Sequence, residues 1–299
     1  MSSAASPLRR EGCGGLILCG GRSARMGYEK ARLRFPDGPL LERVLGRMQQ
    51  VVHPIVLSLA PGQATPALAG DVLTAKDGVA NQGPLWGLVE GFRRLAGHCE
   101  RVVVMPVDMP FLTPPWIARL LDEMADRRAC LYEHEGFANA LTAAYSMDLL
   151  PKLEALVAEG RRRPIFLIEG EDARILTVPE DTAPAGAHPL TDVDTPEAYR
   201  DALLHEGIGQ PGAPEVTVEI QTAASAANVF PAGYLALYAE RAGDVLFAAQ
   251  QLYPELTITR AGADVRLLRN VDGEPEAPLE PHAPLWRGEH LRLEVSGGV

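Results

Sequence analysis

Apolar residues follow two different periods along the first two thirds of the chain. Short runs of consecutive apolar residues, typical of strands buried on both faces, are bounded by turn residues. The expected strands are residues 14–19, 53–60, 101–107, 141–145 and 174–178. Apolar residues spaced three or four apart instead predict helices at residues 39–52, 84–95, 113–124, 148–159 and 195–204. Strands that alternate with helices predict a layered α/β domain over residues 1–205.

The pattern changes in the last third of the chain. Residues 206–214 are rich in glycine and proline, which is typical of a linker. After the linker, alternating residues predict strands and one stretch has helical spacing. Together they predict a small α+β domain over residues 215–299. The expected strands are 216–220, 265–269 and 290–295, and the expected helix is 243–253.

Length and charge agree with two unlike domains. A chain of 299 residues suits two domains at about 150 residues each. The formal net charge is −11, so the chain lacks the overall basic character of nucleic-acid-binding proteins, and we expect no nucleic-acid partner. Residues 206–299 hold six arginines, no lysine and 13 acidic residues. The whole chain has only three lysines, Lys30, Lys76 and Lys152.

The sequence predicts a cytoplasmic chain without a membrane partner. Residues 1–12 are small and polar and lack the apolar core of a secretory signal. The apolar runs are far shorter than the ~20 residues of a membrane span. The cysteines form no CxxC pair and no cluster with zinc spacing, which favours a reducing compartment. They are Cys13, Cys19, Cys99 and Cys130.

The segment after the first expected strand carries candidate phosphate-binding residues. It reads LCGGRSARMGYEK over residues 18–30. Gly20 and Gly21 have no Cβ, so a phosphate can approach the backbone, whose successive N–H groups bind anions in such turns. Arg25 and Lys30 add positive charge. The spacing fits neither the Walker A loop nor GxGxxG. The residues alone leave two interpretations open, a phosphate-binding loop and an ordinary glycine-rich turn.

Asp108 directly follows the buried run at 101–107 and precedes Met109-Pro110-Phe111. Ligands of open α/β sheets gather at the carboxyl ends of strands, where a carboxylate is well placed to hold Mg²⁺. A helix-capping or turn aspartate before a proline is the other interpretation. Thr195-Pro196 has the pattern of a helix N-cap followed by the first helical residue. Asp192 and Asp194 would share one side of a strand, if this segment is a strand.

Four motifs in this order resemble the molybdenum cofactor guanylyltransferases and their nucleotidyltransferase-like relatives over residues 14–204. The motifs are LCGGRSARMGYEK, GPLWGL, VVVMPVDMPFL and DVDTPEAY. The resemblance implies a three-layer, Rossmann-like nucleotide-diphospho-sugar transferase fold. It also implies an enzyme that transfers GMP from GTP to molybdopterin or molybdenum cofactor and releases pyrophosphate, with Mg²⁺ as cofactor.

The resemblance also implies the residues of the site. Lys30 would contact phosphate, Asp108 would hold Mg²⁺, and Arg25 joins these two as a catalytic residue. Ser58 stands where relatives carry a guanine-reading asparagine, and Arg161–Arg163 match a basic stretch on the pterin side, although a solvated helix end is the alternative. The nucleotide-binding residues implied are Leu18, Cys19, Gly20, Gly21, Lys30, Ser58, Asp77 and Asp108.

The chain departs from the family pattern at three places. Cys19 replaces a usual alanine, Glu29 replaces a usual aspartate, and Asp192 and Asp194 replace two asparagines of an NxNTP motif. A DxDTP motif also occurs in cytidylyltransferase relatives. The alternatives are therefore a cytidylyltransferase acting on molybdenum cofactor and a non-catalytic scaffold for cofactor assembly.

Residues 215–299 resemble the small sulfur-carrier subunit of molybdopterin synthase. The matching segments are VTVEI, AGDVLFAAQQLYPEL, LLRNVDGEP and PLWRGEHLRLEVSGG, whereas residues 226–238 match poorly, as an insertion would. The resemblance implies a β-grasp, ubiquitin-like fold, with the synthase large subunit or an adenylating enzyme as partner. Such carriers end in Gly-Gly, whereas here Val299 follows Gly297-Gly298. We therefore expect either a carrier that loses Val299 or a docking module.

Overall fold

The computed structural model describes residues 7–20, 25–65, 71–76, 83–179, 187–223, 232–257, 264–269 and 278–296. The chain divides into two compact units, and each unit is discontinuous in sequence. Unit 1 comprises Met1–Arg22 and Leu41–Thr191, and unit 2 comprises Ser23–Leu40 and Asp192–Val299. A short segment of the N-terminal half thus belongs to the same unit as the C-terminal third. The domain limits expected at residues 205 and 215 stay a prediction.

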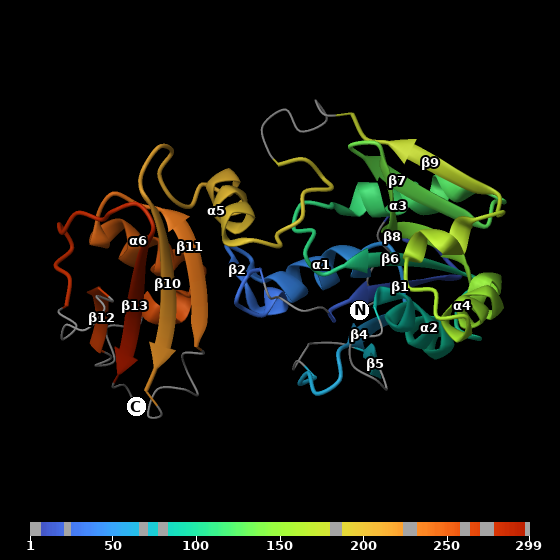
Figure 1. The fold of residues 1–299 in the computed structure, drawn as a ribbon, viewed down its shortest axis with the longest axis horizontal. Coiled ribbons are helices and arrows are strands. Elements are labelled where there is room, and N and C mark those ends of the chain that lie inside the picture. Colours follow the sequence, from blue (N-terminus) through green and yellow to red (C-terminus); the bar gives the residue numbers. More distant parts are fainter. Residues whose placement is uncertain are drawn as a thin grey trace. The chain divides into compact units, whose positions relative to one another are not determined.

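Unit 1 contains a seven-stranded mixed sheet with the order β5-β4-β1-β6-β8-β7-β9 (Figure 1). Four strands, β5, β4, β1 and β6, are mutually parallel, and β8 is antiparallel to both β6 and β7. The expected α/β domain is therefore confirmed, with one reversed strand. The strands are β1 (Cys13–Leu18), β4 (Ile55–Leu59), β5 (Val72–Lys76), β6 (Arg101–Pro106), β7 (Ala129–His134), β8 (Phe137–Ser146) and β9 (Ala173–Thr177).

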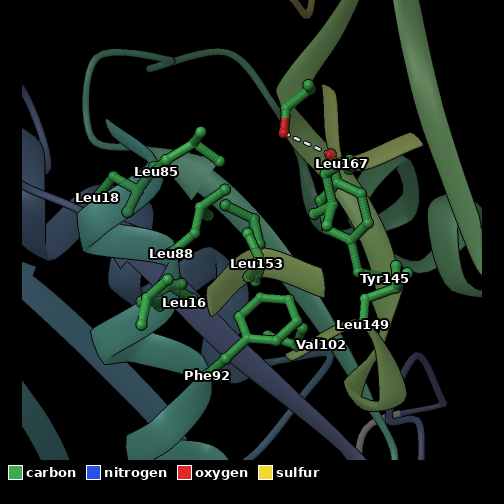
Figure 2. Close-up of a cluster of buried hydrophobic side chains, with 14 of the residues drawn as sticks. Leu16, Leu18, Leu85, Leu88, Phe92, Val102, Tyr145, Leu149, Leu153 and Leu167 are labelled. Carbon is green, nitrogen blue, oxygen red and sulfur yellow. Dashed lines mark hydrogen bonds between the residues drawn. The ribbon is translucent and has the colours of Figure 1, made fainter. Parts of the chain in front are cut away.

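Helices cover both faces of this sheet. On one face, leucines of α2 and α4 pack onto side chains of β1, β6 and β8 (Figure 2). Gly91 of α2 lies so close to β1 that a Cβ there would be 2.4 Å from Leu16. Tyr145, inside this cluster, donates a hydrogen bond to the carbonyl of Ala140 at 2.6 Å. The elements of this layer are α2 (Pro84–Leu95), η2 (Met147–Leu149), α4 (Leu150–Ala158) and η3 (Pro164–Ile168).

The opposite face is covered by α1 (Leu40–Gln49) and α3 (Pro114–Met124). A Cβ at Gly15 would lie 2.3 Å from the sulfur of Met48, so α1 packs tightly on β1. From α3, the carbonyl of Trp116 accepts a hydrogen bond from the Tyr132 hydroxyl at 2.7 Å. The sheet thus lies between two helical layers, which confirms the three-layer expectation for this unit.

Unit 2 contains a four-stranded sheet with the order β11-β10-β13-β12. The central pair, β10 and β13, is parallel, and each edge strand is antiparallel to its neighbour. Helix α6 follows β11, and α5 packs against β11. The elements are η1 (Lys30–Arg32), β2 (Arg34–Phe35), β3 (Gly38–Pro39), α5 (Pro196–His205), β10 (Glu215–Thr222), β11 (Gly233–Tyr238), α6 (Ala242–Leu252), η5 (Pro254–Thr257), β12 (Asp264–Arg269) and β13 (Glu289–Ser296).

Two sequence expectations need correction. The poorly matching stretch 226–238 was expected to be an insertion, but its last six residues form β11, an integral edge strand. The segment with Asp192 and Asp194 is not a strand, so alternation does not decide which way these side chains face. Among the described residues, no helix has the length and apolar character needed to span a membrane.

Candidate active site

The strand order of unit 1 defines a switch point between β1 and β6. From β1 the chain proceeds to β4 and β5 on one side, then returns to β6 on the other side of β1. The connections that leave β1 and β6 therefore lead in opposite directions along the sheet, toward β4 and toward β7. In open α/β sheets, ligands bind in the crevice at such a point, outside the carboxyl ends of the strands.

The connection after β1 contributes the first candidate residues. The Cys19 amide donates to the carbonyl of Ser58 in β4 at 2.9 Å, which holds the loop against the neighbouring strand. Leu18 and Cys19 are buried, and Gly20 is exposed. A Cβ at Gly20 would lie 3.3 Å from the Ala60 amide nitrogen, so the glycine accommodates a close approach of two loops. Gly21 lies outside the described residues.

The turn after β6 contributes Asp108, which is half-buried. The turn is fixed on three sides. The Val107 amide donates to the Leu18 carbonyl at 3.1 Å, and the buried Thr142 hydroxyl donates to the Met109 sulfur at 3.1 Å. The Pro110 carbonyl accepts a hydrogen bond from Arg47 of α1. Asp108 is thus a turn residue at the switch point, and Thr113, not Asp108, is the N-cap of α3. No motif in the sequence indicates that Arg47 and Thr142 hold this turn.

Ser58 and Asp77 were expected to contact the nucleotide. Ser58 lies at the carboxyl end of β4, but its side chain is 2% exposed and faces α2, where a Cβ on Gly87 would be 2.8 Å from its hydroxyl oxygen. A guanine contact by Ser58 stays a prediction. Asp77 lies outside the described residues, as does the chain up to Gln82.

Arg25 and Lys30 belong to unit 2. Lys30 begins η1 and is half-buried. The Arg25 guanidinium is 2.7 Å from a carboxylate oxygen of Asp194, and the Arg25 side chain is 76% exposed. The ion pair joins Arg25 to the DxDTP motif and offsets the negative charge of one of the two carboxylates in that motif. Thr195 accepts a hydrogen bond from the Ala198 amide at 3.2 Å, which confirms the expected N-cap of α5.

The basic stretch Arg161–Arg163 follows α4 in unit 1. The Arg161 guanidinium carbon lies 3.6 Å from the centre of the Phe166 ring, and this side chain also pairs with Glu169 at 2.9 Å. A Cβ on Gly83 would lie 3.7 Å from the Arg162 carbonyl, so the stretch passes close to the start of α2. Arg162 and Arg163 are exposed. The pterin-side role of this stretch stays a prediction.

The donor set at the switch point suits a weakly held divalent cation. Within the described part of the chain, no three His, Cys, Asp or Glu side chains gather into a metal site. A single half-buried carboxylate, Asp108, fits Mg²⁺, which is usually held by one or two carboxylates together with substrate phosphates. It does not fit zinc, which takes three or four protein ligands.

A mixed α/β sheet between two helical layers, with a glycine loop and a carboxylate at its switch point, is the arrangement with which Rossmann-like domains bind nucleotides. The profile of the MobA-like NTP transferase domain matches residues 15–173, about half of the chain. The chain therefore belongs to the MobA-like NTP transferase family.

Named relatives agree with this membership. A probable molybdenum cofactor guanylyltransferase of Mycobacterium avium is 34% identical over 183 residues, which are 60% of this chain and 92% of the relative. Two solved structures share the fold. Molybdopterin-guanine dinucleotide biosynthesis protein A of Archaeoglobus fulgidus has a TM-score of 0.50 at 22% identity, covering 65% of this chain and 97% of its own. A nucleotidyl transferase of Methanothermobacter thermautotroptrophicus has a TM-score of 0.51 at 18% identity, covering 66% and 98%.

Proposed function

We propose that this chain transfers GMP from GTP to molybdopterin or molybdenum cofactor, with release of pyrophosphate. Family membership and the name of the Mycobacterium avium relative support the proposal. The observation that carries it is the hydrogen bond between Val107 and Leu18, which joins the Asp108 turn to the first loop at the switch point. A nucleotide-binding loop and a metal-binding carboxylate belong together in this chemistry.

In the proposed reaction, a terminal phosphate oxygen of the pterin attacks the α-phosphorus of GTP, and the bond to pyrophosphate breaks. No protein nucleophile is needed, so catalysis consists of positioning and charge stabilisation. Backbone N–H groups of the first loop and the Lys30 ammonium stabilise the charge that develops on the leaving pyrophosphate. Asp108 would hold a divalent cation, which when bound supplies Lewis-acid stabilisation between two anions.

A nucleotide screen with the full chain tests the proposal. Molybdopterin is combined with GTP, CTP or ATP and Mg²⁺, and pyrophosphate release is measured. We expect turnover with GTP. Turnover with CTP alone would favour the cytidylyltransferase alternative, whose DxDTP motif the chain shares. Absence of turnover together with absence of Mg²⁺-dependent GTP binding would favour the scaffold.

A lysine pair tests the assignment of the phosphate-binding residue. Lys30→Ala should lower turnover about 10- to 100-fold with the fold intact, because it removes a cation that stabilises the leaving group. Lys152→Ala is the matched control, since Lys152 lies in α4 and pairs with Glu171 at 2.7 Å. Near-normal GMP transfer by Lys30→Ala would contradict the assignment, and circular dichroism of both variants verifies folding.

For the C-terminal region, we infer a β-grasp module related to sulfur carriers, used for docking to the large subunit of molybdopterin synthase or to an adenylating enzyme. The order β11-β10-β13-β12, with its parallel central pair and α6 after the first hairpin, supports this assignment. Residues 297–299 lie outside the described residues. Calorimetric titration of the full chain with the synthase large subunit tests docking, and intact-mass measurement after incubation with ATP and an adenylating enzyme tests carrier chemistry.

A further inference from the structure

The segment that carries Lys30 is bound at both of its ends by one backbone atom of unit 2. The Tyr28 hydroxyl donates to the Ala232 carbonyl at 3.2 Å, and the Arg32 guanidinium donates to the same oxygen at 3.3 Å. Tyr28 and Arg32 lie two residues before and two residues after Lys30. The last residue of η1 and the residue two positions before the helix are therefore both bound to the residue that precedes β11.

Aromatic contacts reinforce this attachment. Tyr28 stacks on Tyr234 of β11, with ring centres 5.7 Å apart and planes inclined by 19°. The guanidinium carbon of Arg34 lies 4.9 Å from the ring centre of Tyr253, which follows α6. Burial raises the pKa of both Tyr28 and Tyr234 above the usual value, as expected for two rings that shield each other from water.

The close approach of Tyr253 to the start of β11 requires a glycine at residue 233. A Cβ at Gly233 would lie 2.2 Å from the Tyr253 hydroxyl oxygen, a distance that excludes any side chain without movement. Gly233 thus lets the Tyr253 ring pack against the first residue of β11. If these rings served only core packing, the effect of removing one of them on turnover would not depend on Lys30.

We propose that Tyr234 is a positioning residue for nucleotidyl transfer, which acts by holding Tyr28 and thereby Lys30. The inference rests on the proposed role of Lys30 at the phosphates. In this way the C-terminal sheet contributes to the reaction without touching substrate, and a partner that displaces the start of β11 changes the turnover of the nucleotidyltransferase. Stacking between two rings restricts Tyr28, and the paired hydrogen bonds to Ala232 fix the rotation of η1.

Kinetics of the full chain test the proposal. Tyr234→Ala should lower kcat about tenfold, because small displacements of a charge-stabilising group are costly in the transition state, whereas KM for GTP changes less. Tyr234→Phe retains the stacked ring and should restore parental kcat. Phe247→Ala, which removes an aromatic side chain that is 65% exposed on α6 of the same unit, is the control and should leave turnover unchanged.

A double variant separates positioning from packing. If Tyr234 acts through Lys30, the loss caused by Tyr234→Ala disappears when Lys30 is already alanine. Losses that multiply in the double variant would overturn the proposal. A Tyr234→Ala chain that folds and turns over normally would overturn it as well, while the proposed function stands. By contrast, a parental chain without GMP transfer would refute the proposed function itself.

Hydrogen exchange supplies a readout that is independent of activity and of folding losses. The Leu33 amide donates to the Lys30 carbonyl at 3.0 Å, and the Arg32 amide donates to that of Glu29 at 3.0 Å. In Tyr234→Ala these two amides should exchange faster than in Tyr234→Phe, while β13 amides stay protected. Equal exchange in the two variants would show that the stacked ring does not hold η1.

Discussion

The Asp108 turn and the Lys30 segment are held in place in different ways. The Asp108 turn, residues 107–110, is held by the sheet and by α1 of its own unit, through the Leu18 carbonyl, Thr142 and Arg47. The Lys30 segment, residues 25–40, is instead held by side chains that follow it by more than 150 residues, among them Tyr199 and Tyr234. The carboxylate therefore lies in a turn held by its own sheet and the adjoining helix α1, whereas the lysine lies in a segment held by residues far along the chain.

Removing the charge of Asp108 has the largest expected effect. Asp108→Asn keeps the size of the side chain, so the turn should persist while GMP transfer falls at least about 100-fold, or about 2.7 kcal/mol in the activation barrier. Steady-state pyrophosphate release measures it. Asp126→Asn, in the exposed turn after α3, is the control. A loss of secondary structure in Asp108→Asn would show that the carboxylate itself is needed to keep the turn folded.

The close packing of α2 on β1, the strand that ends at Leu18, can be measured with two glycine substitutions. Gly91→Ala places a Cβ 2.4 Å from the fully buried Leu16 and should lower the free energy of unfolding by about 1–3 kcal/mol. Gly46→Ala, in α1, meets no atom within 4 Å and should raise it by about 0.5–1 kcal/mol. Urea denaturation of both variants gives these values, and equal effects would show that α2 can shift away from β1.

A buried hydroxyl tests the attachment of the Lys30 segment. Tyr199 of α5 is fully buried and donates to the Arg34 carbonyl at 2.6 Å, and its ring meets Phe35 edge-on. Tyr199→Phe leaves that carbonyl without this donor and should cost about 1 kcal/mol of stability. Tyr238→Phe removes an exposed hydrogen bond to Asp201 and should cost less. If the order of the two is reversed, the segment is not held through α5.

The smallest effect concerns a peripheral ion pair of unit 1. Arg10 binds both carboxylate oxygens of Asp122, at 2.6 and 2.7 Å, and its hydrogen bonds lower the pKa of that carboxyl below the usual 3.8. A lowered folded-state pKa means that the stabilisation is complete above the usual pKa and is lost as the pH falls below it. Because Asp122 is half exposed, Asp122→Asn should cost about 0.5 kcal/mol or less at pH 7, and less still at pH 2. Thermal melts at both pH values measure the difference, and an equal cost at pH 2 would exclude the ion pair as its source.

Much of unit 1 could be predicted from local pattern. The apolar spacing at 84–95 predicts α2 with the same first and last residues as in the structure. The β-branched run at 101–107 predicts β6 and places Asp108 directly after it. The sequence pattern does not predict strands β7 and β11. Their sequences, ACLYEH and GYLALY, contain no β-branched residue, and helical and extended spacing are hard to distinguish in them. Strand β5 is only half-buried along most of its length, so its apolar signal is weak.

The candidate site likewise contains residues that local sequence pattern predicts and contacts that it does not. The first loop and Asp108 follow from strand ends, which the sequence marks clearly. The ion pair of Arg25 with Asp194, and the contacts of Tyr28 and Arg32 with Ala232, join residues distant in the chain, and no spacing in a single sequence indicates them. The acceptor in the last case is a backbone carbonyl, which carries no residue-type signature at all.

The discontinuity of unit 2 limits how freely the two parts of the chain can be exchanged in evolution or by design. Residues 23–40 belong to the same unit as residues 192–299. A gene divided within the glycine- and proline-rich stretch 206–214 would therefore not encode two fragments that each contain a complete unit. The N-terminal piece would expose the apolar and aromatic side chains of residues 25–40 to water. A protease that cleaves only within 206–214 should accordingly produce two fragments that stay associated.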